Sequence, residues 1–149
     1  YTVDLVIDQG GYFELKRHRM MTQTPQPLTA LLGYAVPRAI VEAQVETAYR
    51  DAMRAAHQAY CRVAESFPAA ASYLVPNGFN RRVLAEFNLR EAFAFCQLRS
   101  ASNAHFSIRR VAQRIYEEMN RVHPLLTKYM KLNDETWQGV EENYFTVVA

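Results

Sequence analysis

The strongest constraint on the fold is a long stretch of helical periodicity between Pro37 and about Phe67. Apolar side chains recur there at steps of three or four residues, while polar side chains fall mostly between them. Pro37 suits the first turn of a helix, and Pro68 ends the pattern. We therefore expect one long amphipathic helix, whose apolar positions are Val41, Val45, Tyr49, Met53, Ala56, Tyr60, Val63 and Phe67.

Strands are predicted on both sides of this helix. Tyr1 to Ile7 is rich in β-branched and aromatic residues with partial alternation, and Phe79 to Phe87 is expected to form a second strand. A β-prone run at 144–148 ends the chain. Asp8 to Gly11 is expected to separate the first strand from a short helix. The predicted helices besides the long one span residues 12–18, 89–99, 102–122 and 124–130. This order predicts an α+β domain that is helix-dominated, with a small antiparallel sheet.

A loop is predicted at Thr22 to Pro27, where the sequence reads T-Q-T-P-Q-P. Its two prolines lack backbone N–H donors and fix φ, so the segment can be neither a helix nor a central strand. The loop directly follows an arginine-rich stretch.

Length and composition place the chain among globular domains. Its 149 residues suit one domain, 1–149, and half of them are hydrophobic. The net charge of +2 gives no reason to expect nucleic acid or an anionic membrane as a partner. No apolar run is long enough to span a membrane, and no signal peptide is visible, so a cytoplasmic location is expected. Because the chain opens at Tyr1 rather than methionine, we expect it to be part of a longer polypeptide.

The sequence contains no stock catalytic motif and no grouping of His, Cys and carboxylates with metal-ligand spacing, so no metal is expected. Cys61 and Cys96 lie in predicted helices among apolar residues, and we interpret both as reduced core residues. We interpret His57 as a solvated or core histidine. If the protein handles a hydride or an electron, a cofactor must supply that chemistry.

Arginine dominates the basic residues. Only Lys16, Lys128 and Lys131 among the 17 basic residues are lysines, which leaves fourteen arginines. A high genomic GC content would produce this bias without any function. The alternative is an anion site, because a guanidinium group donates two parallel hydrogen bonds to phosphate or carboxylate oxygens.

Three segments concentrate arginines beside polar residues: Glu14 to Arg19, Asn88 to Arg90 and Gln97 to Arg99. A solvated charged patch at a helix end is the simpler explanation for the first segment. We hypothesise instead that the fold brings the three together as a site for a nucleotide or a nucleotide-like cofactor.

The second segment opens a predicted helix with Asn88 as its N-cap. The free amide groups and positive dipole end of a helix N-terminus attract anions. Arg90 in that first turn is unfavourable for the helix alone, which favours an anionic partner. Arg99 follows about two and a half turns later, near the face of Phe95, so the helix cannot aim both arginines at one ligand atom.

These residues resemble two motifs of the flavin-dependent thymidylate synthases (the ThyX family). The first family motif begins Arg-His-Arg, and Phe13 to Arg19 (F-E-L-K-R-H-R) is similar to its opening. The second is a strand ending in Asn-x-Arg and then an apolar helix ending in Leu-Arg, which Phe87 to Arg90 and Leu98-Arg99 match in order. Ala71 to Pro76 and the long helix match in type and spacing. The resemblance extends over nearly the whole chain and corresponds to the C-terminal two thirds of the family fold.

The resemblance implies a ThyX-like domain of a homotetrameric enzyme with sites shared between subunits. Such an enzyme moves a methylene group from methylenetetrahydrofolate to dUMP, giving dTMP, with FAD delivering the hydride and NADPH as a co-substrate. Arg17 and Arg99 would bind the substrate, and Arg99 would be the catalytic residue that holds and polarises the uracil ring. The residues that would contact the flavin, by their position in the motifs, are Arg17, His18, Arg19, Asn88 and Arg90.

The stretch after Arg19 departs from the family motif. Ser72 also replaces a phosphate-side arginine of the family, and Ala94 replaces a flavin-side asparagine. The resemblance implies that the loop cradles the dUMP phosphate, so lost N–H donors and a lost arginine predict weaker phosphate binding. Where the family loop has Ser, Asn, Glu, Ser and Arg, this chain has Thr22, Thr24, Pro25, Pro27 and Thr29.

Three functional hypotheses follow. The first is a catalytic thymidylate synthase with a diverged loop, in which Arg17 and Arg99 still act on dUMP or a related pyrimidine nucleotide. The second is a non-catalytic ThyX-like half that binds flavin or assembles with a catalytic partner domain. The third is an arginine-rich helical interaction domain without a ligand. Both ThyX hypotheses predict a homo-oligomer, a tetramer by resemblance, or association with a second ThyX-like domain.

Overall fold

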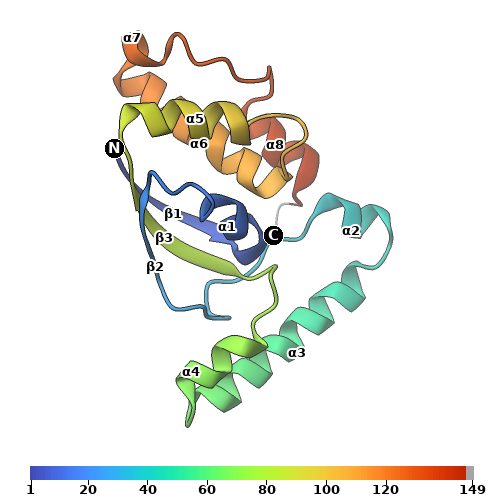
Figure 1. Ribbon diagram of the computed structural model, residues 1–149. Coiled ribbons are helices and arrows are strands. Elements are labelled where there is room, and N and C mark those ends of the chain that lie inside the picture. The colour runs from blue at the N-terminus through green and yellow to red at the C-terminus, as the bar shows by residue number, and fades with distance from the viewer. Residues whose placement is uncertain (147–149) are drawn as a thin grey trace.

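The computed structural model describes residues 1–146. Its strands are β1 (Thr2–Asp8), β2 (Thr22–Pro25) and β3 (Asn80–Glu86). Its helices are α1 (Gln9–Leu15), α2 (Arg38–Glu42), α3 (Glu46–Ala64), α4 (Pro68–Ala71), the 3-10 turn η1 (Ser72–Leu74), α5 (Leu89–Arg99), α6 (Phe106–Val122), α7 (Pro124–Thr127) and α8 (Trp137–Tyr144). The predicted class is confirmed: the fold is α+β, helix-dominated, with one small antiparallel sheet in the described residues (Figure 1).

The sheet has the strand order β1-β3-β2, and β3 runs antiparallel to both neighbours. The strands β1 and β3 pair along the full length of both. Alternation along β3 buries Val83 and Ala85 and leaves Leu84 about half exposed. The predicted strands at the N-terminus and after the long helix are therefore confirmed, and they form the middle and one edge of the sheet.

The main core lies where the sheet meets α1, α5 and α6. Ile7, Leu15, Phe95 and Ile108 are all fully buried in it. Helix α6 contacts α1, α5, α7, α8 and β1, so it is the central helix of this layer. This core fixes the relative positions of α1 and α5, on which the arginine-rich segments lie.

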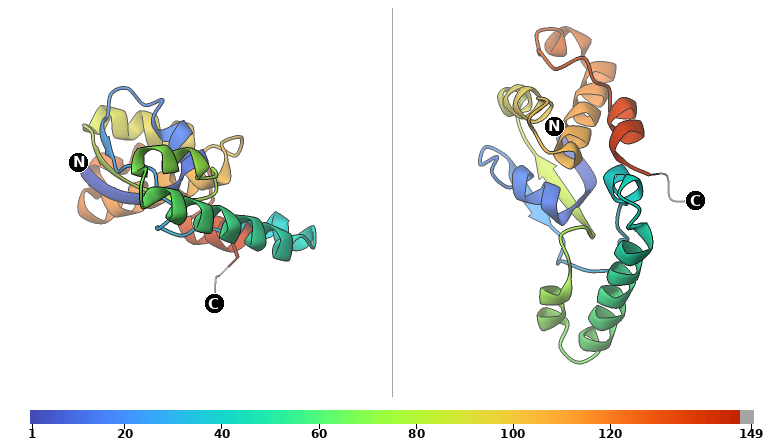
Figure 2. Two further views of the ribbon diagram at one scale, coloured as in Figure 1. Left: turned by 90° about the horizontal axis from the view of Figure 1, so that it is seen from below. Right: turned by 90° about the vertical axis from the view of Figure 1, so that its right-hand side faces the viewer.

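The predicted long helix is wrong as a single helix. It is divided into α2 and α3 at Ala43–Val45, where Gln44 has a left-handed φ of 58°. Helix α3 together with α4 and η1 forms an arm (residues 46–74) that extends away from the sheet (Figure 1, Figure 2). Met53 is the only buried residue of α3. The periodicity correctly predicted helical structure in this stretch, but it showed neither the break at residues 43–45 nor what covers the apolar stripe.

The segment predicted as a loop after Arg19 is partly an edge strand. Thr22–Pro25 pairs with β3, and the Gln26 N–H donates to the Arg82 carbonyl at 3.0 Å. A proline is tolerated here because an edge strand uses only part of its backbone donors for pairing. The prediction that this segment is not a central strand is confirmed.

Two helices begin at other residues than predicted. Helix α1 starts at Gln9, since Asp8 accepts a hydrogen bond from the Gly11 N–H at 2.8 Å and caps a helix that continues through two glycines. Helix α6 starts at Phe106 rather than residue 102, with His105 as its N-cap. In both cases the capping side chain, rather than the apolar pattern, determines the first residue.

The C-terminal part contains a helix that the sequence did not predict. Thr136 caps α8 by accepting from the Gly139 N–H at 3.0 Å, and α8 packs on α6. The predicted β-prone end is only partly described: Tyr144 ends α8, Phe145 forms a single bridge with Pro37, and residues 147–148 lie outside the described residues.

Both cysteines are free thiols, as predicted, but only Cys96 is a core residue; the prediction that Cys61 lies in the core is wrong. Cys96 is fully buried in α5, and burial raises the pKa of its thiol to about 12. Cys61 is half-buried in α3, with its Sγ 3.6 Å from Nε2 of His57.

Candidate functional site

The arginine-rich segment Glu14 to Arg19 occupies the C-terminal end of α1 and the turn that follows. Helix α1 ends at the fully buried Leu15, and the chain returns to the core at Met21. From β2, Nε2 of Gln23 donates to the carbonyl oxygens of Leu15 at 3.0 Å and His18 at 3.2 Å. Buried Leu15 and Met21 therefore anchor the two ends of the turn in the core, and the hydrogen bond from Gln23 to His18 fixes its middle.

Helix α5 faces this turn. Its predicted bounds and its N-cap are confirmed, because Oδ1 of Asn88 accepts from the backbone N–H of Glu91 at 3.0 Å. Glu91, Phe95 and Arg99 follow at four-residue steps and therefore share one face of the helix. That face lies against the turn.

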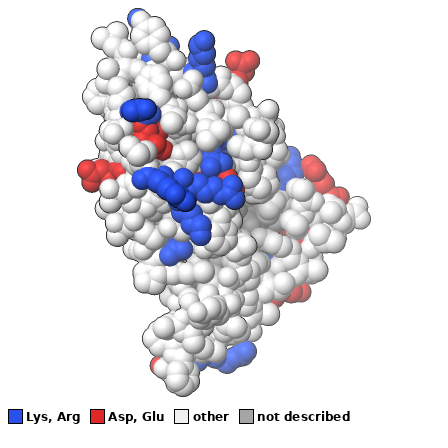
Figure 3. Space-filling view, in the orientation of Figure 1, with Lys and Arg blue, Asp and Glu red and all other residues white. Residues whose placement is uncertain are grey.

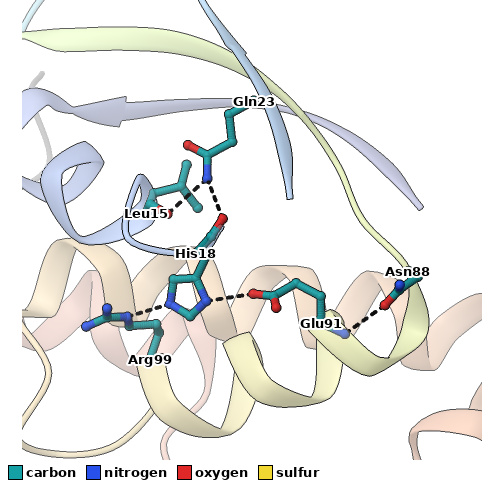
Figure 4. A network of polar contacts seen from close by, with 6 residues as sticks. All are labelled: Leu15, His18, Gln23, Asn88, Glu91 and Arg99. Atoms are coloured by element: carbon teal, nitrogen blue, oxygen red, sulfur yellow. Dashed lines mark hydrogen bonds and ion pairs between the residues drawn. The ribbon is translucent and has the colours of Figure 1, made fainter. Parts of the chain in front are cut away.

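His18 is at the centre of a polar network between the turn and α5 (Figure 4). Its Nδ1 lies 2.7 Å from Oε1 of Glu91, and its Nε2 accepts from Nε of Arg99 at 2.8 Å. Nη1 of Arg99 donates to Oε2 of Glu14 at 2.6 Å. The imidazole packs edge-on against Phe95, with ring centroids 4.9 Å apart. His18 and Glu91 expose only 8% of their side chains and Arg99 14%, so water has little access to the network.

This environment disfavours a charged imidazole. Burial lowers the pKa of His18, the hydrogen bond to Glu91 opposes that effect, and the Arg99 guanidinium adds to the lowering. The pKa of His18 therefore lies below its ordinary value of 6.5, and the ring is neutral at neutral pH. The contact with Glu91 is a hydrogen bond to a carboxylate rather than an ion pair.

The remaining predicted residues lie exposed around this network. Arg17 exposes 66% of its side chain and pairs with Glu14 at 3.4 Å. Arg19 and Arg90 are exposed, and within residues 1–146 neither forms an ion pair. Figure 3 shows basic side chains gathered across the middle of the face on which α1 and α5 lie. The fold thus brings the three predicted segments together, while the ligand contacts of these residues stay predictions.

Sequence reasoning missed Glu91, the most buried carboxylate of the network. An acidic residue in the first turn of a helix is ordinary, because it complements the helix dipole, so its identity alone does not mark a functional site. The available signal was its four-residue spacing to Phe95 and Arg99. Gln23, which holds the turn from β2, gave no such signal.

A groove of about 640 Å³ lies elsewhere, between β1 and the helices α6 and α8. It is lined by Thr2 to Val6 and by side chains that include Arg110, Arg114 and Trp137, and it contains none of the predicted site residues. Within residues 1–146, no three His, Cys, Asp or Glu side chains form a potential metal site. None of the helices described there is long and apolar enough to cross a membrane.

Comparison with known proteins identifies the family. A family model described as thymidylate synthase complementing protein matches residues 1–125. The chain belongs to this family. The resemblance to flavin-dependent thymidylate synthases that the two motifs indicated is thereby confirmed at the level of the family.

Curated relatives of two kinds resemble the chain. A UPF0159 protein of Chlamydia muridarum (strain MoPn / Nigg) is 37% identical over 134 residues, covering 90% of this chain and 25% of that protein. The UPF0159 protein Ta1429 of Thermoplasma acidophilum is 35% identical over 136 residues, covering 90% and 27%. The flavin-dependent thymidylate synthase of Saccharolobus solfataricus is 31% identical over 134 residues, covering 83% of this chain and 50% of that protein.

The chain spans about a quarter of the length of the UPF0159 relatives and half of the length of the Saccharolobus protein. The two kinds of relative therefore differ about twofold in length. Members of the family occur as polypeptides that contain far more than the stretch matched here.

Proposed function

We propose that this chain is a flavin-binding domain of the thymidylate synthase type. It takes part in transferring a methylene group from methylenetetrahydrofolate to dUMP, giving dTMP, with FAD as the cofactor and NADPH as the reductant. The observation that carries the proposal is Arg99, a guanidinium group that is fixed by protein contacts on two sides and only 14% exposed.

Arg99 is suited to bind the pyrimidine ring. His18 engages its Nε and Glu14 its Nη1, whereas no residue of 1–146 accepts a hydrogen bond from Nη2. Figure 4 shows its terminal nitrogens pointing away from the imidazole, where they can donate to a carbonyl oxygen of a nucleotide base. A guanidinium held with little access to water stabilises negative charge on such an oxygen more strongly than a solvated one.

The exposed arginines fit the chemistry of FAD. The diphosphate of this cofactor presents oxygens in pairs, and a guanidinium group donates to two of them at once. Three exposed arginines flank the contact between the turn and α5: Arg17, Arg19 and Arg90. Arg17 pairs with Glu14, whereas Arg19 and Arg90 form no ion pair within residues 1–146. We assign the diphosphate to these three, with His18 and Asn88 shaping the surface beneath. When bound, FAD supplies the hydride that completes the methyl group.

The segment 22–29 offers few backbone donors to the dUMP phosphate. Thr22–Pro25 is paired in β2, and Pro25 and Pro27 have no N–H to offer. This observation supports a second candidate function, in which the chain is a non-catalytic ThyX-like half. A second ThyX-like domain would then supply the phosphate-side donors. The length of the UPF0159 relatives, about four times the matched stretch, is consistent with such a tandem arrangement.

Both functions include assembly. The arm exposes large apolar side chains, among them Phe67 at 67% and Tyr73 at 91%. We propose that a partner covers this surface, either in a homo-oligomer such as a tetramer or through a second ThyX-like domain. The free thiols of Cys61 and Cys96 support a cytoplasmic location, where thiols stay reduced.

Visible absorbance of the desalted protein after incubation with FAD tests the proposal. We expect retained flavin and a spectral change when dUMP is titrated into the sample. Arg99→Ala should keep the flavin and lose the response to dUMP. Arg121→Ala, at an arginine of α6 with 73% of its side chain exposed, is the matched control and should behave as the unaltered protein.

The other outcomes separate the candidates. Retained flavin that does not respond to dUMP favours the non-catalytic half. Absence of retained flavin refutes the catalytic function and a flavin-binding half, and leaves the family fold and a half that acts only through assembly.

A further inference from the structure

Glu91, His18 and Arg99 form a continuous chain of contacts between α5 and the turn after α1, with distances of 2.7 and 2.8 Å. We propose that Glu91 is a positioning residue: it fixes His18 as the Nδ1–H tautomer, so that the unprotonated Nε2 holds Arg99 in one orientation. This inference rests on the proposed function, because it explains how the guanidinium group is aimed at the pyrimidine.

The contact with Arg99 shows which ring nitrogen carries the proton in this arrangement. A guanidinium group is always protonated and only donates, so the contact from its Nε requires a lone pair on Nε2 of His18. The neutral ring then carries its proton on Nδ1, which faces a carboxylate oxygen of Glu91. In the opposite tautomer an N–H would face the Arg99 N–H, and a lone pair would face the carboxylate. Only the Nδ1–H form matches every donor with an acceptor.

The surroundings restrict the imidazole to this position. The ring is almost fully buried and lies edge-on to Phe95 at 4.9 Å, while the carbonyl of His18 accepts from Gln23. Glu91 lies in the first turn of α5, three residues after the N-cap. Nε of Arg99 donates to His18 and Nη1 donates to Glu14, so two hydrogen bonds fix the plane of the guanidinium group. The N–H groups of Nη2 therefore point in a single direction.

Protonation of His18 would disrupt this arrangement. The imidazolium would present an N–H at both nitrogens, and Nε2–H would face Nε–H of Arg99. The charged groups that act on the ring are Glu91 and Arg99 from α5 and Glu14 from α1. The carboxylates favour the added proton, whereas Arg99 and burial oppose it. The affinity for a pyrimidine nucleotide should therefore fall as the pH drops through the folded-state pKa of His18, which lies below its ordinary value.

Long-range ¹H–¹⁵N correlation spectra of the histidine rings test the tautomer without any ligand. We expect the Nδ1–H form for His18, assigned by the loss of its signals in His18→Gln. Glu91→Leu should convert the ring to the Nε2–H form, whereas Glu91→Gln keeps an acceptor oxygen and preserves Nδ1–H. An Nε2–H form of His18 in the unaltered protein overturns the proposal, and this measurement requires no variant of Glu91 that must fold.

The affinity for dUMP, measured by calorimetry on the flavin-loaded protein, is the functional readout. Glu91→Leu should weaken binding at neutral pH by about tenfold, and Glu91→Gln should restore it to within about twofold of the unaltered protein. Glu118→Leu, at a carboxylate of α6 with 43% of its side chain exposed, is the matched control. Equal affinities for Glu91→Leu and the unaltered protein overturn the proposal. If the unaltered protein shows the Nδ1–H form but does not bind dUMP, the proposed function fails and the fixed orientation of Arg99 stands.

Discussion

Replacing Phe95 by leucine tests how firmly the site is built into the core. Phe95 is fully buried, belongs to the main core and lies edge-on to His18 at 4.9 Å. Phe95→Leu removes about three side-chain carbons, each worth about 0.8 kcal/mol when buried. It also removes an aromatic contact worth about 0.5–1.5 kcal/mol. Because leucine refills part of the space, we expect a loss of about 2–3 kcal/mol from a total stability on the order of 5–15 kcal/mol.

Thermal unfolding followed by circular dichroism measures this loss. A domain of this size loses about 2–4 °C in Tm for each kcal/mol, so Phe95→Leu should lower Tm by about 5–10 °C. Phe13→Leu, at a residue of α1 that is 36% exposed and contacts Lys16, is the matched control and should lower Tm by about 2 °C at most. A Tm for Phe95→Leu no lower than that of the control would refute the reasoning that this ring supports both the core and His18.

Three further predictions concern stability. The fold lowers the pKa of His18 below its ordinary value of 6.5. The stability that the neutral ring contributes is therefore fully present above pH 6.5 and is lost as the pH falls through the folded-state pKa. The free energy of unfolding, measured by urea titration at a series of pH values, should therefore fall more steeply with decreasing pH in the unaltered protein than in His18→Gln. Parallel plots of this free energy against pH would contradict the prediction. Asn88→Ala should lower the free energy of unfolding by about 1 kcal/mol, because the N-cap of α5 is lost. The control Asn103→Ala, in an exposed turn, should lower it by less than about 0.5 kcal/mol. Equal urea midpoints for the two variants would exclude the capping role. Glu135→Leu should cost about 3 kcal/mol, because it leaves the guanidinium of Arg109, only 9% exposed, without its carboxylate; a change below about 1 kcal/mol in the same assay would show that Arg109 finds another partner.

Local signals in the sequence were sufficient for several elements. The helix 89–99 was predicted with its correct bounds, since Asn88 is a strong N-cap residue and its side chain bonds the backbone of its own first turn. A strand was also predicted from Phe79 to Phe87, and it forms at Asn80–Glu86, where alternation buries Val83 and Ala85. Both features depend on contacts within a few residues of the chain or on a simple period.

Partners distant in the sequence were not predictable in the same way. Thr22–Pro25 becomes a strand only because β3 lies beside it, more than fifty residues later in the chain. The break at Gln44 leaves the apolar period almost unchanged, so the periodicity could not show that α2 and α3 are separate helices. The apolar stripe of α3 likewise gives no information about which surface covers it.

For the candidate site the division is similar. The sequence by itself determined the family, the arginine-rich segments and the helix on which Arg99 lies, because these depend on residue identity and on local spacing. Only the tertiary structure decided that His18 contacts Glu91 and Arg99, which follow it in the chain by 73 and 81 residues. The reason is physical: a shared core brings α1 and α5 together, and a buried imidazole must find a partner for each ring nitrogen at the position where that contact places it.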